Sequence, residues 1–397
     1  MKEFQQSEAL QRLPDQFFAK LVKKLHTYQQ QGRDLINLGQ GNPDQPTPDH
    51  IVKSLQQAAE NPVNHKYSPF QGFDHLKEAV ATYYKREYDV DVDPDQEVAV
   101  LFGSKAGLVE LSQCFLNTGD VALVPDPGYP DYWSGVALAD GVMEPLPLLE
   151  ENGFLPNYGD IEEETLNKAK LMFLNYPNNP TSAVANRAFF EETVEIADQH
   201  DICVVHDFAY GAIGFDGDKP LSFLQVPGAK NVGVEIYTMS KTFNMAGWRI
   251  AFAVGNPSVV QALELIQDHY YVSLFGAVQD AAADALLGSQ DCVDNIKDMY
   301  ERRRNILATG LQEAGYEFTP CKGSFFMWLK APEGYSSESF ADELLDKVGL
   351  FTAPGIGFGE YGESYVRIGL NNSEESLLDA VKRFKAFKKE HVKKPEQ

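Results

Sequence analysis

The sequence holds few of the features that mark metal-binding, membrane or disulfide-stabilised proteins. Its four cysteines are scattered without CxxC or metal-ligand spacing, so we expect neither a disulfide framework nor a cysteine-based metal site. No apolar run reaches the length of a membrane span, and the first residues, MKEFQQSEALQRL, are too polar for the apolar region of a signal peptide. We therefore expect a cytoplasmic protein that binds no metal ion and no membrane.

Positive charge is scarce as well. The 397 residues include 34 lysines and arginines against 58 aspartates and glutamates, which gives a formal net charge of −24. Nucleic-acid binding requires lysine and arginine faces against the phosphate backbone, so this composition argues against a nucleic-acid partner. A solvated acidic surface that favours solubility explains the charge, and adaptation to a salt-rich cytoplasm is the alternative.

Short apolar runs alternate with longer segments of helical pattern, and there is no internal repeat or low-complexity linker. The runs are near-continuously apolar, as is typical of strands that are covered on both faces. Their alternation with helical segments predicts an α/β fold with a mainly parallel sheet. The predicted strands are residues 98–103, 121–126, 171–176, 202–207, 234–239 and 249–255.

The pattern changes after this region. A long helical stretch (276–313) is followed by the strand-like SFFMWLK (324–330), a helix near 337–348 and the strand-like YVRIGL (365–370). These elements predict a smaller α+β domain, which the first residues of the chain join because they precede the α/β alternation. We expect a large α/β domain over residues 45–290 and a small domain made of residues 1–44 and 291–397.

Polar side chains follow the predicted strands at the ends where open α/β sheets bind ligands. The turn GSKAG (103–107) leads into a helical pattern, which suits an anion held by backbone N–H groups. The stretch GFGEYG (357–362) fits GxGxxG but lacks the strand and helix of a dinucleotide site, so we reject that interpretation. The other candidate residues at strand ends are Tyr129, Asn179, Asp207, Tyr210, Thr238, Ser240, Lys241 and Arg249.

Lys241 is the most informative of these candidates, because it lies in the apolar stretch YTMSKTFNMAGWR and a buried ammonium is costly unless it is used. An amine suits an aldehyde, and Asp207 suits a protonated ring nitrogen. Tyr129 offers a stacking face, whereas Asn179 and Tyr210 offer donors to a phenolate oxygen. With the GSK amides, Thr238, Ser240 and Arg249 as a phosphate site, the set describes pyridoxal 5′-phosphate held as a Schiff base on Lys241.

The sequence resembles the class I/II pyridoxal-phosphate-dependent aminotransferases of fold type I over nearly its whole length. The motifs that carry the resemblance are NLGQGNPD (37–44), HKYSPFQG (65–72), PDPGYP (125–130), NYPNNPT (175–181), HDFAYG (206–211), TMSKTFNMAGWR (238–249) and YVRIGL (365–370). It implies a mainly parallel seven-stranded-type sheet in the large domain. One departure is Ser182, where the family has glycine, and there we expect a shifted turn rather than lost activity.

The resemblance also implies a role for each matching residue. Lys241 would be the catalytic base and Asp207 the partner of the ring nitrogen, with Asn179 and Tyr210 on the ring oxygen and Tyr129 against the ring. Arg367 would bind the substrate α-carboxylate in a bidentate way, with Gly41 leaving room for it. Tyr67 would reach the phosphate of a neighbouring subunit, which implies a homodimer with shared active sites. The phosphate would lie among Ser104, Lys105, Thr238, Ser240 and Arg249.

The substrate side chain is expected to be apolar. Dicarboxylate-specific relatives carry a second arginine near the segment QDHYYVSLFGAVQ (267–279), which has none here, and diaminopimelate aminotransferases carry asparagine where this chain has Phe275. Phe17 and Phe18 are expected beside the substrate, although packing at the core or dimer interface would also explain such aromatic residues. Runs such as VVHDFAYGAIGFDG make the chain similar to bacterial methionine-salvage transaminases, which convert 4-methylthio-2-oxobutanoate to methionine.

Several alternatives stay open at this point. Aspartate, aromatic and diaminopimelate aminotransferases share the motifs, and a pyridoxal-phosphate carbon–sulfur β-lyase shares the early chemical steps but needs no amino acceptor. A transcriptional regulator on this fold would need an added DNA-binding domain, for which there is no extension or basic patch. A binding module that had lost catalysis would lack Lys241. The amino donor and the direction of the reaction are not written in the sequence.

Overall fold

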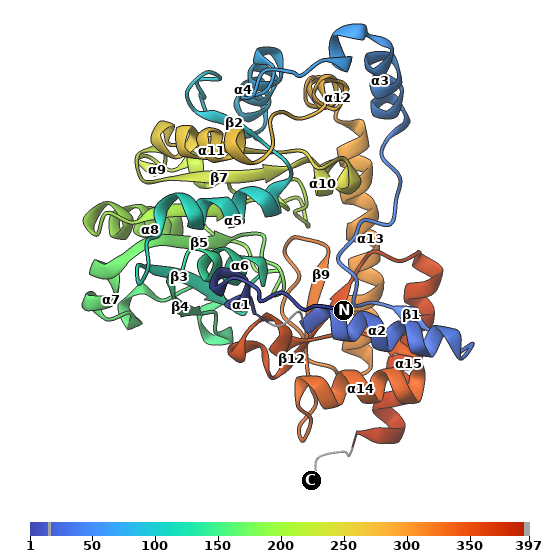
Figure 1. The fold of residues 1–397 in the computed structure, drawn as a ribbon. Helices are drawn as coiled ribbons and strands as arrows, with labels where there is room; N and C mark the ends of the chain where they lie inside the picture. The colour runs from blue at the N-terminus through green and yellow to red at the C-terminus, as the bar shows by residue number, and fades with distance from the viewer. Residues whose placement is uncertain (15–16, 393–397) are drawn as a thin grey trace.

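A seven-stranded sheet forms the centre of the molecule in the computed structural model, which describes residues 1–14 and 17–392 (Figure 1). Its strands lie in the order β2-β8-β7-β6-β5-β3-β4. The pairs from β7 to β4 are parallel, whereas β8 runs antiparallel to both β2 and β7. The prediction of a mainly parallel α/β sheet is therefore confirmed. Its strands are β2 (Val98–Leu101), β3 (Val121–Asp126), β4 (Val142–Pro147), β5 (Ala169–Asn175), β6 (Cys203–Asp207), β7 (Gly233–Thr238) and β8 (Ala251–Gly255).

Helices cover the sheet on both faces, and the alternation of side chains along the strands explains why. In β2, Val98 and Val100 pack into one core with residues of three helices, α4 (Asp74–Tyr88), α8 (Arg187–Gln199) and α12 (Gly276–Leu287). Ala99 and Leu101 pack into another core with residues of α5 (Ser104–Phe115), α6 (Asp131–Leu138) and α11 (Pro257–Tyr270). Successive strand residues point to opposite faces, so a strand covered twice must be apolar at every position. This is the pattern that made the strands recognisable.

One strand of the seven-stranded sheet, β4, was not predicted from the sequence. β4 contains two prolines, Pro145 and Pro147, and it exposes Val142 and Met143 to solvent. It lies at the edge of the sheet, where it pairs with β3 alone. A strand at an edge tolerates proline because one side of its backbone has no ladder to complete. The apolar-run criterion therefore could not detect β4.

The remaining strands form two small sheets. β9 (Phe326–Lys330), β11 (Ala353–Pro354) and β12 (Tyr365–Gly369) make an antiparallel sheet, and β1 (Ile36–Asn37) pairs with β10 (Leu350–Phe351). The β1–β10 pair joins the N-terminal segment to the C-terminal part of the chain. The division at residues 44 and 290 stays a prediction, and residues 15–16 and 393–397 of the predicted small domain lie outside the described residues.

The predicted helix over 276–313 is two helices, α12 and α13, separated at Gly288. No helix in the described part of the chain is both long and apolar enough to cross a membrane. The α-helices are α1 (Glu8–Gln11), α2 (Phe17–Gln30), α3 (Asp49–Glu60), α4 (Asp74–Tyr88), α5 (Ser104–Phe115), α6 (Asp131–Leu138), α7 (Glu163–Lys168), α8 (Arg187–Gln199), α9 (Ala229–Val232), α10 (Met239–Thr242), α11 (Pro257–Tyr270), α12 (Gly276–Leu287), α13 (Asp291–Glu313), α14 (Ser337–Val348) and α15 (Glu374–His391).

Candidate active site

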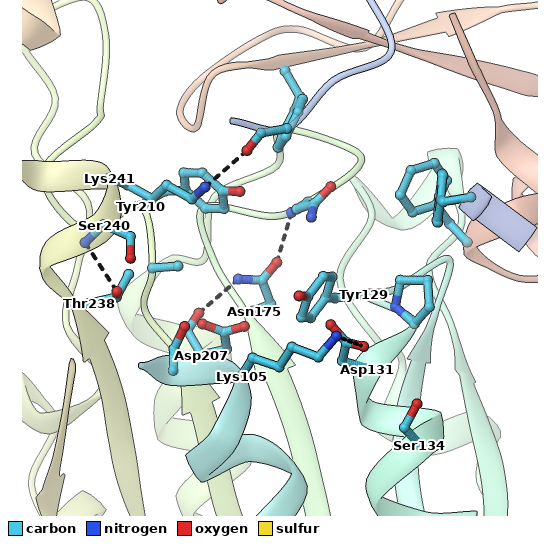
Figure 2. Close-up of a pocket in the computed structure, with 18 of the residues that line it drawn as sticks. Lys105, Tyr129, Asp131, Ser134, Asn175, Asp207, Tyr210, Thr238, Ser240 and Lys241 are labelled. Atoms are coloured by element: carbon cyan, nitrogen blue, oxygen red, sulfur yellow. Dashed lines mark hydrogen bonds and ion pairs between the residues drawn. The ribbon is translucent and has the colours of Figure 1, made fainter. Parts of the chain in front are cut away.

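A cavity of about 460 Å³ lies at the carboxyl ends of the parallel strands (Figure 2). It is bounded by the large sheet on one side and by the N-terminal segment, the 355–358 turn and β12 on the other. Fourteen of the sixteen residues predicted from the sequence line it. They are Phe17, Phe18, Gly41, Ser104, Lys105, Tyr129, Asn179, Asp207, Tyr210, Thr238, Ser240, Lys241, Arg249 and Arg367.

Lys241 lies in the short helix α10, directly after strand β7. Its amine donates a hydrogen bond to the Gly41 carbonyl oxygen at 2.9 Å. Burial lowers the pKa of Lys241 to about 8, and the nearby positive charge of Arg367 acts in the same direction. A lysine with such a pKa is partly uncharged near neutral pH, which is the form that attacks a carbonyl or accepts a proton.

Asp207 ends strand β6 and is buried. One carboxylate oxygen accepts a hydrogen bond from the Tyr132 hydroxyl at 2.8 Å. The other oxygen, Oδ1, is buried and has no hydrogen-bond partner among the residues that the structure describes. Burial raises the pKa of Asp207 to about 6. An orphaned buried carboxylate oxygen at a cavity wall fits a protonated ring nitrogen, so this position suits the predicted cofactor.

Two asparagines tie the adjacent strand ends together. The Asn175 amide donates to the Asp207 backbone carbonyl at 2.8 Å, and its side-chain oxygen accepts the Asn179 N–H at 2.7 Å. Asn179 uses its own amide oxygen to accept from Arg367 at 2.8 Å. Its amide nitrogen is then the group available to donate to a ring oxygen. Asn175 therefore acts on the site by fixing the backbone, and the NYPNNPT motif pointed to it.

Arg367 is buried in strand β12 between two aromatic rings. Its guanidinium carbon lies 4.0 Å from the Phe326 ring centroid and 4.7 Å from that of Phe358. Burial lowers its pKa to about 10, and Nε has no hydrogen-bond partner among the described residues. A buried guanidinium without a carboxylate is costly, so the arrangement suits an anionic ligand.

The anion end of the cavity forms where α5 begins at Ser104. Gly103, at φ +91°, brings the backbone against Arg249, because an added Cβ would lie 2.2 Å from the Arg249 Nη2 atom. Thr238 and Ser240 face this end, and the Thr238 hydroxyl accepts the Ser240 backbone N–H at 3.1 Å. A helix N-terminus, two hydroxyls and a guanidinium together fit a phosphate group.

Lys105 lies differently from the expectation. Its ammonium forms an ion pair with the Asp131 carboxylate at 2.8 Å (Figure 2). Direct contact between Lys105 and a phosphate therefore stays a prediction. Asp131 itself was missed, although it directly follows the PDPGYP motif (125–130). Other cavity residues without a sequence-based assignment include Pro14, Trp133, Ser134, Phe326 and Phe358.

Tyr67 and Phe275 do not line the cavity of the single chain. The Tyr67 side chain is 86% exposed and Phe275 is 48% exposed. Their segments are held together, because Ser68 donates to the Leu274 carbonyl oxygen at 2.7 Å. The cavity role of Phe275 is therefore not seen within one chain, and the role of Tyr67 depended on a second subunit from the start.

Ser182 does not need the shifted turn that was expected. It occupies the left-handed region at φ +64°, a conformation that glycine adopts freely and serine adopts at some cost. Its hydroxyl donates to the Phe326 carbonyl oxygen, which offsets part of that cost. The turn after NPT thus has a backbone that a glycine would also adopt.

Comparison with known proteins agrees with this geometry. Residues 33–384 match the family described as aminotransferase class I and II. The chain is 61% identical over 380 residues to the L-glutamine–4-(methylsulfanyl)-2-oxobutanoate aminotransferase of Bacillus subtilis (strain 168), with 96% of each chain covered. It is 44% identical to an LL-diaminopimelate aminotransferase of Halothermothrix orenii, with 96% of this chain and 97% of that one covered. The substrate-bound BacF structure from Bacillus subtilis matches with a TM-score of 0.92 at 46% identity and 98% coverage of both chains.

Proposed function

The chain belongs to the class I and II aminotransferase family and is an aminotransferase, and we propose that it transfers an amino group to 4-(methylsulfanyl)-2-oxobutanoate to form methionine. The relative at 61% identity carries that substrate in its name, together with L-glutamine as the partner. We propose glutamine as the amino donor here on the same ground. Among the described residues that line the cavity, no cation is free for a second carboxylate, which supports the choice of an uncharged side chain.

The family depends in general on pyridoxal 5′-phosphate, and the cavity residues fit that cofactor. We propose that Lys241 holds it covalently through Nζ, Asp207 Oδ1 accepts from the ring nitrogen, and Asn179 and Tyr210 donate to the ring oxygen. Tyr129 packs against the ring, and Ser104, Thr238, Ser240 and Arg249 surround the phosphate. When bound, the cofactor supplies an electron sink for the carbanion that forms at the substrate Cα.

The chain's own residues then handle the substrate and the proton. Arg367 binds the α-carboxylate, with Gly41 leaving space beside it; an added Cβ there would lie 3.7 Å from Arg367 Nη2. The Lys241 amine would accept the proton from the substrate Cα and later give it back. Its lowered pKa, about 8, suits both accepting and releasing that proton. Asp207, as a carboxylate, holds the proton on the ring nitrogen.

The single observation that carries the substrate proposal is that each cationic side chain described at the cavity already has a partner or an assigned role. Four cationic side chains line it among the described residues: Lys105, Lys241, Arg249 and Arg367. The last three are needed for the cofactor and the α-carboxylate, and Lys105 is neutralised by Asp131. Phe17, Phe18 and Phe358 supply an apolar wall instead. A thioether fits this wall, whereas the second carboxylate of aspartate would lie there unpaired.

We propose that the enzyme works in the cytoplasm as a homodimer. Tyr67 and Phe275 belong to a surface that exposes further large apolar side chains, and exposed apolar groups on this scale favour a protein interface. In such a dimer Tyr67 would reach the phosphate and Phe275 the substrate in the neighbouring subunit. The other exposed apolar residues of this surface lie in α11 and in the loops that carry Tyr67 and Phe275. They are Phe70, Leu265, Tyr270, Tyr271 and Val272.

The test is to assay purified enzyme, loaded with pyridoxal 5′-phosphate, for methionine formed from glutamine and 4-(methylsulfanyl)-2-oxobutanoate. In parallel, the visible absorption of the cofactor is recorded after addition of methionine or aspartate. We expect methionine to change the spectrum quickly and aspartate slowly. Fast conversion by aspartate with none by methionine would reject the substrate while keeping the mechanism.

An LL-diaminopimelate aminotransferase is the second candidate, because relatives at 44% identity carry that name. The Lys105–Asp131 pair places one positive and one negative charge at the cavity. The second ammonium and carboxylate groups of diaminopimelate would contact these two charges. The same assay with LL-diaminopimelate and 2-oxoglutarate distinguishes the two. We expect this pair to give far lower kcat/KM than methionine, because Phe275 replaces the asparagine that we associate with such enzymes.

A further inference from the structure

The stretch GFGEYG, rejected above as a dinucleotide motif, forms one wall of the active site. We call residues 355–362 the glycine loop. It consists of two short 3₁₀ turns, Gly355–Phe358 and Glu360–Gly362. Gly357 and Phe358 line the cavity, and Phe358 packs on Arg367, with 4.7 Å from the guanidinium carbon to the ring centroid. The position of this loop therefore determines the shape of the substrate side of the site.

The loop is held from the large sheet by Asp126, the last residue of strand β3. One carboxylate oxygen of Asp126 accepts the Glu360 backbone N–H at 3.1 Å, and the other accepts the Tyr361 N–H at 3.1 Å. A third bond in the same place joins the Gly128 N–H to the Phe358 carbonyl oxygen at 2.8 Å. Two adjacent N–H groups converging on one carboxylate form an anion-binding turn.

The glycines of the motif are explained by what approaches them. An added Cβ at Gly359 would lie 2.0 Å from Asp126 Oδ1, and Gly359 has φ +137°, which side chains rarely adopt. At Gly357 a Cβ would lie 2.4 Å from the Phe17 ring, and at Gly362 it would lie 2.2 Å from the Gly355 carbonyl oxygen. The GxGxxG spacing thus serves a close fit to Asp126, to α2 and to the loop itself.

We propose that Asp126 is a positioning residue for substrate specificity: by binding the amides of residues 360 and 361 it fixes Phe358 between Arg367 and the side chain of the substrate. Phe358 also meets Phe18, with 5.1 Å between ring centroids, and Trp328, with 5.9 Å. Its ring is thus fixed on three sides once the loop is docked. The inference rests on the proposed function for the nature of that side chain.

The burial of Asp126 agrees with this role. Burial raises its pKa to about 6, against the lowering effect of the two backbone hydrogen bonds, and the charge of Glu360 adds to the rise. At neutral pH the group is therefore a carboxylate with both oxygens in use. Replacement by asparagine keeps the shape but turns one oxygen into a donor, which faces an N–H group and cannot accept it.

The experiment compares Asp126→Asn with Asp120→Asn. Asp120 precedes the same strand, and its carboxylate also accepts a backbone N–H, from Asn117 at 2.8 Å, but far from the glycine loop. For Asp126→Asn we expect KM for methionine to rise about tenfold with kcat nearly unchanged. Amide hydrogen exchange in the peptide spanning residues 355–362 should also become about tenfold faster. Asp120→Asn should change neither quantity.

A double-mutant cycle separates positioning from a general loss of structure. In a Phe358→Leu background, Asp126→Asn should change KM less than about twofold, because the ring that it positions is gone. Additive effects on KM would overturn the proposal, as would faster loop exchange with an unchanged KM, or wild-type exchange in Asp126→Asn. If Asp126→Asn does not fold, Gly359→Ala tests the same contact from the loop. Inactivity of the wild-type enzyme with methionine would reject the proposed function, whereas the exchange result would still judge the Asp126 contact.

Discussion

The amine of Lys241 donates to the carbonyl oxygen of Gly41 at 2.9 Å, although the two residues are 200 positions apart in the sequence. Gly41 belongs to the segment that connects β1 with α3, so the N-terminal part of the chain holds the reactive lysine of the large sheet. The lysine is thereby directed into the cavity before any cofactor binds. Pre-organisation of this kind reduces the conformational entropy that the lysine side chain loses when it reacts.

We expect Lys241→Ala to lower the transamination rate by at least about 10³-fold, since it removes both the covalent attachment and the base. The visible absorption of the protein after incubation with pyridoxal 5′-phosphate should differ from that of the wild type. Lys77→Ala is no fair comparison because Lys77 is buried against Glu264. Exposed Lys168 is the matched control, and Lys168→Ala should behave as the wild type. Substantial turnover in Lys241→Ala would contradict the assigned role.

The reactivity of Lys241 should follow its lowered pKa. Because the amine is the reactive form and its pKa is about 8, the uncharged fraction rises tenfold per pH unit below 8 and levels off above it. The initial rate at which cofactor-free enzyme takes up pyridoxal 5′-phosphate, measured by stopped-flow absorption from pH 6 to 10, should show this profile. An ordinary surface lysine, with a pKa of about 10.4, would give a rate that is still rising at pH 10. Such a result would contradict the effect of burial.

Arg367 should contribute to the binding of every amino acid and 2-oxo acid substrate, because all of them carry an α-carboxylate. We expect Arg367→Met to raise KM at least about 100-fold, which corresponds to about 2.7 kcal/mol. The effect should be similar for glutamine and for methionine. Arg302→Met, at an exposed pair with Glu374, serves as the control with the same substitution. A rise in KM confined to one substrate would show that Arg367 contacts the substrate side chain instead of the α-carboxylate.

The sheet and most of the cavity followed from local signals. Strands covered on two faces are apolar throughout, and polar residues at their ends must meet at one edge, so Lys241, Asp207 and Asn179 could be placed together before the fold was known. The edge strand β4 could not be predicted in this way, because its prolines and exposed side chains do not form a continuous apolar run.

The residues that shape the substrate side of the cavity were harder still to predict from the sequence. Asp126 reaches the loop that carries Phe358 only through tertiary contacts, because it binds the N–H groups of residues 360 and 361. Nothing in the local sequence of either segment indicates the other. The glycine spacing indicated a tight turn, but it did not indicate that Asp126 packs against that turn. Likewise, the pairing of Lys105 with Asp131 depends on how the start of α5 faces the start of α6. Sequence reasoning thus finds groups at strand ends better than it finds their partners.

The Lys105–Asp131 pair leads to a prediction about specificity. Asp131→Asn should release the Lys105 ammonium at the cavity wall, where it can meet an acidic side chain. We expect kcat/KM for aspartate to rise about threefold relative to methionine, since the new ion pair is partly exposed to solvent and contributes only about 0.7 kcal/mol. Steady-state assays with both amino acids measure the ratio. In the double variant Asp131→Asn/Lys105→Gln the gain should vanish, because no cation remains to be released. Persistence of the gain in that variant would show that Asp131 excludes aspartate by its own charge.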